Sequence, residues 1–230
     1  MFRRRRFSFD LLMATVGFGL FVCAASDSHA LMFHAEINTA ALINDSTGPF
    51  SIEFQFNDGS GVGDANNSVT IENFTFDGGS ASGTPSLIGG AVGSLLNSVT
   101  LMDTSFFNDF VEGFFPGHTL GFDVRLTTNV DLGSTPDIFY FTILDGNYIP
   151  IPTLGLGDAF LLVTIDSPTP PVETFGSDAS RTTIVIDPPT PQQPTPVPSP
   201  GSLSLLATGF LIGIARNGGV RRRVRRRGQV

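Results

Sequence analysis

Apolar and polar residues alternate along most of the chain between residues 31 and 187, with the period of a half-buried β-strand. Clusters of Gly, Asp, Asn and Pro separate the alternating segments, as tight turns require. No long segment follows the 3.6-residue period of a helix. The pattern predicts strands over residues 31–43, 51–56, 68–76, 98–102, 120–128, 138–144, 159–165 and 182–186.

Residues 106–115 are rich in phenylalanine but do not alternate clearly, so their pattern fits either a strand or a turn of helix. About eight strands joined by hairpins and short loops suit two packed antiparallel sheets. We therefore predict an all-β fold, an antiparallel β-sandwich of the jelly-roll or immunoglobulin-like type, over residues 31–187.

The core of this sandwich should be built from phenylalanine. The chain has 22 Phe, two Tyr and no Trp, and strand phenylalanines recur at alternate positions: Phe54 with Phe56, Phe74 with Phe76, and Phe139 with Phe141. Each buried Phe contributes about 1.5 to 3 kcal/mol of transfer free energy. The single cysteine, Cys23, lies before the predicted sandwich, so stability must come from this core and not from disulfides.

Charge is strongly segregated along the chain. Residues 31–200 hold 19 carboxylates and two arginines, a charge of −17, whereas the other 11 arginines lie near the two ends. A surface of this sign repels phosphate backbones, and nucleic-acid binding requires the opposite sign. Nucleic acid is therefore excluded as a partner of the middle segment.

The N-terminal segment has the three parts of a secretory signal. Arg3 to Arg6 are followed by an apolar run over residues 11–25 and by the small residues Ser28 and Ala30. The apolar run is shorter than the roughly 20 residues of a membrane-spanning helix. We predict a signal helix within residues 1–30, export of the chain, and cleavage by signal peptidase after Ala30.

The C-terminal segment also has three parts. Residues 188–200 include seven prolines, which predict an extended linker outside any sheet. Residues 203–215 are apolar or small and would rise about 20 Å as a helix, against a hydrocarbon core of about 30 Å. Six arginines between Arg221 and Arg227 keep that end cytoplasmic and place the acidic middle outside.

This tail, with Pro198-Ser199-Pro200 before the short apolar helix, resembles the PEP-CTERM sorting domain of exported Gram-negative proteins. The family has Pro-Glu-Pro at this motif, so Ser199 replaces a glutamate. The resemblance implies that residues 201–230 hold the protein temporarily in the inner membrane. It also implies that an exosortase removes the tail and passes the protein to the cell surface or exopolysaccharide matrix. A permanent membrane anchor is the alternative.

The middle segment resembles the small all-β ectodomains commonly attached to PEP-CTERM tails. The similarity is carried by residues 56–61, 74–83 and 122–127, which are structural motifs. It implies a β-sandwich at the cell surface and assigns no active-site residue.

Candidate groups for catalysis are few. The chain has no lysine and no cysteine beyond Cys23, and the imidazoles beyond the signal are those of His34 and His118. Nucleophilic catalysis needs a nucleophile with a base beside it. We therefore predict that the protein is not an enzyme. A hydrolase that uses a carboxylate pair is an alternative, because it needs only two acids about 5 to 10 Å apart.

Residues 57–68 combine oxygen donors with flexible glycines, which is the chemistry of a calcium loop. The candidate ligands are Asp58, Asp64, Asn66 and Ser68. Val69 and Thr75 stand where an EF-hand has its turn glycine and bidentate glutamate, so the pattern predicts at most a non-EF site. The competing interpretation is an ordinary polar hairpin loop, and no other cofactor is predicted.

Sugar binding would use an exposed tyrosine. Tyr140 lies in an apolar strand, which leaves Tyr148 on its Asp-Gly-Asn turn as the exposed candidate.

Together the signal, the tail and the predicted sandwich indicate an exported structural or adhesive protein of the cell surface or matrix, with exopolysaccharide as a partner. The alternatives are a calcium-assisted carbohydrate-binding module and the secreted hydrolase with a carboxylate pair.

Overall fold

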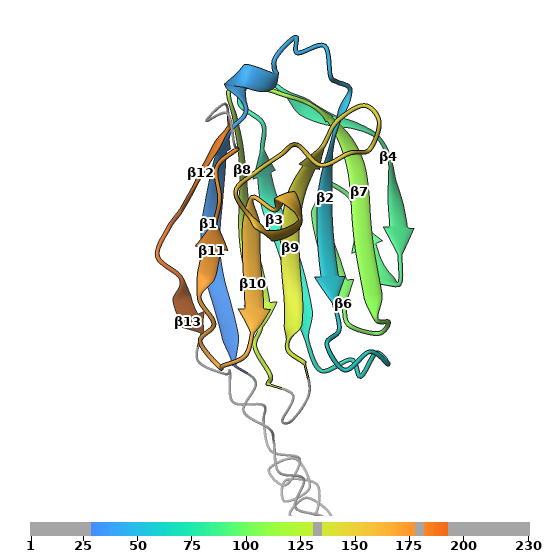
Figure 1. The fold of residues 1–230 in the computed structure, drawn as a ribbon, viewed down its shortest axis with the longest axis vertical. Coiled ribbons are helices and arrows are strands. Elements are labelled where there is room, and N and C mark those ends of the chain that lie inside the picture. The colour runs from blue at the N-terminus through green and yellow to red at the C-terminus, as the bar shows by residue number, and fades with distance from the viewer. Residues whose placement is uncertain (1–28, 131–134, 178–181, 193–230) are drawn as a thin grey trace, which may run out of the picture. The chain divides into compact units, whose positions relative to one another are not determined.

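The computed structural model describes residues 29–130, 135–177 and 182–192 (Figure 1). These residues form two antiparallel sheets packed face to face, so the predicted all-β sandwich is confirmed at this level. The first sheet contains, in spatial order, β12 (Thr183–Ile186), β1 (Ala30–Asn38), β8 (Thr119–Thr127), β3 (Ser68–Thr75), β6 (Ser98–Met102) and β5 (Gly90–Gly93), and β13 (Thr190–Gln192) also pairs with β1.

The second sheet contains, in spatial order, β11 (Val172–Thr174), β10 (Leu161–Ile165), β9 (Asp137–Leu144), β2 (Phe50–Asn57), β7 (Phe107–Phe115) and β4 (Ser80–Ile88). Two short 3-10 turns, η1 (Ala40–Leu42) and η2 (Leu156–Asp158), lie in the connecting loops.

Strands distant in sequence pair with one another in a nested order. β1 pairs with β8, β2 with β7, and β3 with β6. The prediction that successive strands follow one another by hairpins is therefore wrong for most of the fold, although β5 with β6, β9 with β10, and β10 with β11 are such neighbours. Alternation tells which side chains face the core, and it carries no information about which strand lies alongside.

Each predicted strand is present, and all but the strand at residues 98–102 have shifted ends. The first strand stops at Asn38, before η1, and the 159–165 strand begins at Leu161. Residues 107–115 form strand β7, which decides the alternative left open by the sequence. β4, β5, β11 and β13 were not predicted.

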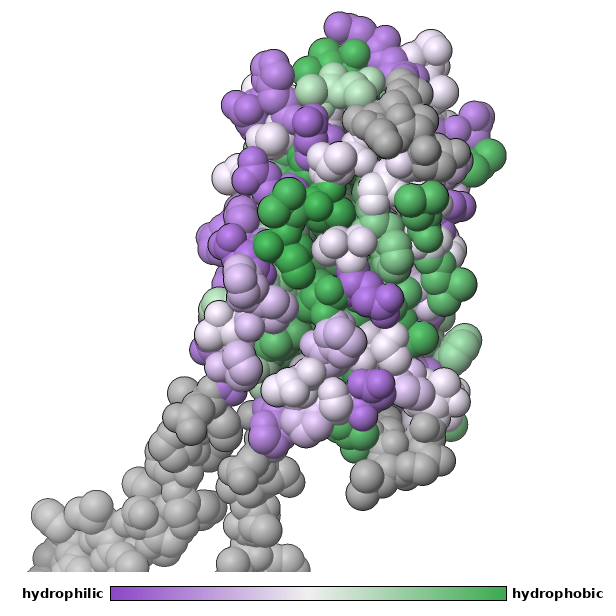
Figure 2. Space-filling view, turned by 60° about the vertical axis from the view of Figure 1, so that its left-hand side comes forward, coloured by the Kyte–Doolittle hydropathy of each residue, from purple (hydrophilic) through white to green (hydrophobic). Residues whose placement is uncertain are grey.

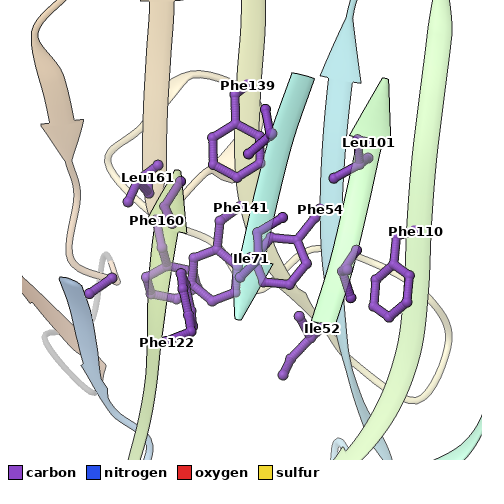
Figure 3. Packing of buried hydrophobic residues seen from close by; sticks show 14 of the residues in the cluster. Ile52, Phe54, Ile71, Leu101, Phe110, Phe122, Phe139, Phe141, Phe160 and Leu161 are labelled. Carbon is purple, nitrogen blue, oxygen red and sulfur yellow. The ribbon is translucent and has the colours of Figure 1, made fainter. Parts of the chain in front are cut away.

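The phenylalanine core predicted from the alternation is confirmed (Figure 3). Phe54, Phe56, Phe139 and Phe141 are fully buried, and the Phe54 ring centroid lies 5.4 Å from that of Phe141 and 5.3 Å from that of Phe122 on the opposite sheet. Phe74 and Phe76 are only partly buried against this cluster, and they lie where the pairing of β3 with β8 shifts register, between Glu72 and Thr75, or just beyond it.

The side of the sandwich between the edge strands β11 and β12 has an apolar surface. Val172, Ile184 and Ile186 pack against the core but stay partly exposed there, and Val185 is exposed. Figure 2, which is turned toward this side, shows apolar residues surrounded by polar ones. Strand pairing does not close the sandwich at this edge.

The first residues of the predicted linker form part of a sheet. Strand β13 contains Pro191, which lies opposite Leu31 in the ladder with β1. The expectation that no part of residues 188–200 joins a sheet is therefore wrong. β13 is an edge strand, where a missing N–H can face solvent without loss of a ladder bond.

The described residues contain no helix that is long and apolar enough to cross a membrane. The predicted signal helix, up to residue 28, and the predicted C-terminal helix lie outside the described residues. So do Pro198, Ser199 and Pro200. Ala30, after which cleavage is predicted, is the first residue of β1. It pairs with Thr127 of β8 and with Gln192 of β13.

Candidate functional site

A cavity of about 320 Å³ lies on the outer face of the second sheet. Its floor comes from β2 and β9, and its roof comes from the loop between β9 and β10, which passes over these strands in Figure 1. The cavity is lined by Glu53, Gln55, Asn57, Tyr140, Thr142, Pro150, Leu156 and Gly157.

The floor follows from the alternation of β2. The side chains of Ile52, Phe54 and Phe56 are buried between the sheets, so those of Glu53, Gln55 and Asn57 point outward. On β9, Tyr140 lies opposite Gln55 and Thr142 lies opposite Glu53. The Thr142 hydroxyl donates a hydrogen bond of 2.5 Å to Glu53 Oε2, which fixes one carboxylate oxygen in the floor.

Hydrogen bonds hold the roof loop in place over the sheet. Thr153 N donates to Asp158 Oδ1 at 3.1 Å, and the Thr153 hydroxyl donates to the Ala159 carbonyl at 2.8 Å. Gly157 adopts the left-handed conformation, φ 64°, that closes this turn. Leu156, 70% exposed, supplies an apolar rim beside the polar floor.

A second carboxylate lies beside the cavity floor. Asp109 on β7 is opposite Gln55, and Glu53 is therefore its diagonal neighbour on the same face, about 7 to 8 Å away between Cα atoms. Asp109 is 6% exposed and its Oδ1 has no hydrogen-bond partner. Burial, together with the charge of Glu53, raises the pKa of Asp109 to about 7.

These two residues form a carboxylate pair on the outer face of the sheet, a kind of pair that the sequence could not locate among 19 candidates. The alternation of β2 could have placed Glu53 on the outer face. It could not have placed Asp109, because Asn108 and Asp109 are consecutive buried residues in a strand without clear alternation.

The predicted calcium loop lies between β2 and β3. Asp58 is buried, and its Oδ1 accepts hydrogen bonds from the backbone N–H groups of Ser60 at 2.6 Å and Gly61 at 3.1 Å. Its Oδ2 accepts from Asp64 N at 3.2 Å. Burial acts to raise the pKa of Asp58, but the hydrogen bonds from Ser60, Gly61 and Gly63 outweigh it and lower that pKa.

The other predicted calcium ligands do not join Asp58 in a common arrangement. Asp64 is exposed and accepts hydrogen bonds from the backbone and side chain of Asn66, at 3.2 Å and 3.1 Å. Ser68 begins β3, where its N–H donates to Thr127 Oγ1 at 2.7 Å. Among the described residues, no three His, Cys, Asp or Glu side chains are arranged to hold a metal ion. Calcium binding stays a prediction.

Two further aspartates lie at this end of the sandwich, and the sequence analysis did not single them out. Asp137 Oδ1 accepts from Gly59 N at 2.8 Å, and Asp137 Oδ2 accepts from the Asn67 side chain at 2.8 Å. Asp103 Oδ2 accepts from Asn67 N at 2.8 Å, whereas Asp103 Oδ1 is buried without a partner. A side chain on Gly59 would come within 1.9 Å of the Thr135 carbonyl, so the loops are tightly packed.

The pKa of Asp103 is raised to about 7, first by burial and then by the charges of Asp137, Asp64 and Asp58. The sequence signal that could have located this aspartate cluster is the position of its members relative to the predicted strands. Asp58 and Asp103 directly follow β2 and β6, and Asp137 begins β9, so each lies at a strand end.

The two histidines and Tyr148 lie away from the cavity lining. His34 Nδ1 and Asp123 Oδ1 are 2.6 Å apart on the first sheet, and His118 is exposed in its turn. Tyr148 is 70% exposed, as predicted, with φ 61°, and it does not line the cavity. The tyrosine at the cavity is Tyr140, which the sequence analysis set aside because its neighbours in β9 are apolar.

Another cavity, of about 420 Å³, lies between η1 and the turn after β9. Asp45 and Asp145 line it, but each accepts local backbone hydrogen bonds, from Thr47 N at 2.9 Å and from Ile149 N at 3.0 Å. These bonds hold the two turns in shape. The cavity on the second sheet has the more varied set of polar side chains.

No family model matches the chain, and no curated protein or solved structure matches it significantly.

Proposed function

We propose that this protein is an exported, surface-sorted adhesive protein whose β-sandwich binds polysaccharide in the cavity on the outer face of the second sheet. The observation that carries the proposal is the composition of that cavity. A carboxylate, two amides, a tyrosine and a threonine form its floor under an apolar rim.

Sugars present hydroxyl groups around their edge and C–H groups on their faces. Gln55 and Asn57 each offer an acceptor oxygen and a donor NH₂ group, and the Tyr140 hydroxyl can do both. Leu156 can cover a C–H face, as the apolar part of a ligand site does. This combination supports an exopolysaccharide as the partner.

We propose binding, and not hydrolysis, because of how the carboxylate pair is placed. Glycoside hydrolysis requires both carboxyl groups to reach the scissile bond. Glu53 lines the cavity, but Asp109 does not line it and its Oδ1 is buried. Only one acid of the pair is therefore available to a sugar, so the hydrolase is the weaker alternative.

Export and sorting are part of the same proposal and rest on the sequence. A secretory signal over residues 1–30 and a PEP-CTERM-like tail over residues 201–230 would deliver the sandwich to the outside of a Gram-negative cell. Signal peptidase and an exosortase-type protease are then the processing partners. A polysaccharide-binding ectodomain is consistent with a matrix destination.

We also propose the jelly-roll type for the sandwich, in preference to the immunoglobulin-like type. Its support is the nested pairing of β1 with β8, β2 with β7, and β3 with β6, which is the order obtained when a long antiparallel ribbon is rolled up.

Calcium assistance is a second candidate function, supported by the unpartnered Asp103 Oδ1 next to Asp58, Asp64 and Asp137. Affinity for calcium depends on the number of charged ligands. Although these aspartates are neighbours, no three of the described carboxylates are arranged to hold one ion. Calcium binding would therefore be weak, with a Kd of about 10⁻⁴ to 10⁻³ M.

A glycan array probed with the mature protein tests the polysaccharide proposal. The variant Tyr140→Ala should lose binding, since it removes the phenol from the cavity floor. Tyr148→Ala is the matched control, because it removes the other tyrosine of the chain from outside the cavity lining. Unchanged binding by Tyr140→Ala, or loss by Tyr148→Ala alone, would refute this site.

A further inference from the structure

We infer that the polysaccharide bound at this cavity carries free amino groups. A sugar ammonium then approaches Glu53, and Asp109 is the neighbouring acidic residue on the same face of the sheet. This inference rests on the proposed sugar-binding function and specifies the class of sugar. It follows from the charges on this face of the sheet, from the unpartnered atom of Asp109, and from what the cavity contains.

The face has negative charge without a positive side chain to balance it. In the part of the chain that the structure describes, Arg125 is the only Lys or Arg, and it lies on β8 in the other sheet. His34 pairs with Asp123 and His118 lies 3.8 Å from Asp77, and neither histidine lines the cavity. Among the described residues no lysine or arginine lines the cavity with Glu53, so a ligand could supply the cation there.

This face of the sheet has a second acidic residue, Asp109, beside Glu53. It is buried, its Oδ1 has no hydrogen-bond partner, and the nearby charge of Glu53 adds to burial in raising its pKa. Burial without a partner is a cost that proteins seldom leave uncompensated. A positive charge held at Glu53 would compensate the Asp109 carboxylate without touching it.

A neutral sugar would leave the Glu53 carboxylate without a positive partner, and an anionic sugar would be repelled by it. An ammonium group gains a charge-assisted hydrogen bond to Glu53, which is stronger than one between neutral groups. The neighbouring cavity residues favour a sugar over a simple amine. Tyr140, Gln55 and Asn57 provide the hydroxyl and amide partners that an isolated ammonium does not need.

Isothermal titration of the mature full-length protein with two matched probes tests the inference. The probes are a tetrasaccharide of glucosamine and a tetrasaccharide of N-acetylglucosamine, which share a backbone and differ in charge. We expect the charged probe to bind about tenfold more tightly at low salt, and this preference to shrink at high salt as screening increases.

The variants Glu53→Gln and Asp109→Asn should each reduce the preference for the charged probe. Glutamine keeps the acceptor oxygen that Thr142 uses, so Glu53→Gln can fold normally. Glu36→Gln is the matched control, since this exposed carboxylate lies on β1 in the other sheet. It should retain the full preference, and circular dichroism checks that all three variants fold.

The other outcomes separate this inference from the proposed function. Equal affinity for the two tetrasaccharides, with loss of both in Tyr140→Ala, would overturn the amino-sugar inference and keep the sugar site. Absence of binding by either probe and by every glycan on the array would overturn both. Equal affinity for tetralysine and for the glucosamine probe would show a general ammonium site and overturn the sugar class.

Discussion

Replacing Asp109 by asparagine should stabilise the protein above pH 7 and change its stability little at pH 4. The wild-type carboxyl group has a pKa of about 7 in the folded protein, because of burial and of the nearby Glu53, against 3.8 in an unfolded chain. Between these values the unfolded state releases a proton that the folded state retains. Stability is therefore lost as the pH rises through this window.

The size of the effect follows from the difference in pKa. Three pH units correspond to about 4 kcal/mol at 1.36 kcal/mol per unit, which is a ceiling. Water penetration and relaxation around an ionised group reduce such penalties, so we expect about 2 kcal/mol at pH 8. Asparagine has the same shape and does not ionise, so Asp109→Asn should recover this amount.

Equilibrium urea unfolding at pH 4 and pH 8 measures the effect. With a slope of about 2 kcal/mol per molar urea, the midpoint of Asp109→Asn should exceed that of wild type by about 1 M at pH 8. Glu173→Gln on the exposed face of β11 controls for the loss of one negative charge. A stability difference that is the same at both pH values would refute the assigned ionisation of Asp109.

Three further predictions concern the core, the loop cluster and the termini. Phe54→Ala should cost about 3 to 5 kcal/mol in urea unfolding, whereas Phe115→Ala, at a 61% exposed residue, should cost less than about 0.5. Millimolar calcium should raise the melting temperature of the wild-type protein relative to EDTA, and it should raise that of Asp103→Asn by less. An identical wild-type melting temperature in calcium and in EDTA would reject the calcium site. N-terminal sequencing of the exported protein should begin at Leu31, and a peptide covering residues 203–215 in mature surface material would contradict tail removal.

The alternation of residues predicted most of the strands and the inward phenylalanines, because hydrophobic burial acts on each strand separately. It failed for β4, where Gly83 and Pro85 interrupt the pattern and the pairing register shifts between Ser82 and Ser86. It failed for the pairing order because the partner of a strand depends on residues far along the chain. The nested arrangement has no local signal.

The candidate site shows the same limit. Glu53 and Gln55 could be placed outward from the pattern of β2, but the cavity exists only because the loop after β9 crosses that face. Tyr140 was set aside because its neighbours in the strand are apolar, although the inward alternation of Phe139 and Phe141 already implied that Tyr140 points outward. Asp103 and Asp109 acquire their unusual ionisation from burial, which no single residue type predicts.

The position of β1 determines when the sandwich can be completed. β1 is the first strand in the described residues, yet its outer edge is covered by β12 and β13, and Ala30 pairs with Gln192 across about 160 residues. Until those last strands have been made, a long strand near the N-terminus has one unpaired edge, which another chain could extend. The ladder that protects this edge closes only when residues 183–192, which precede the proposed sorting tail, have been made. A chain truncated ahead of β12 should therefore have an incomplete first sheet and be prone to aggregation.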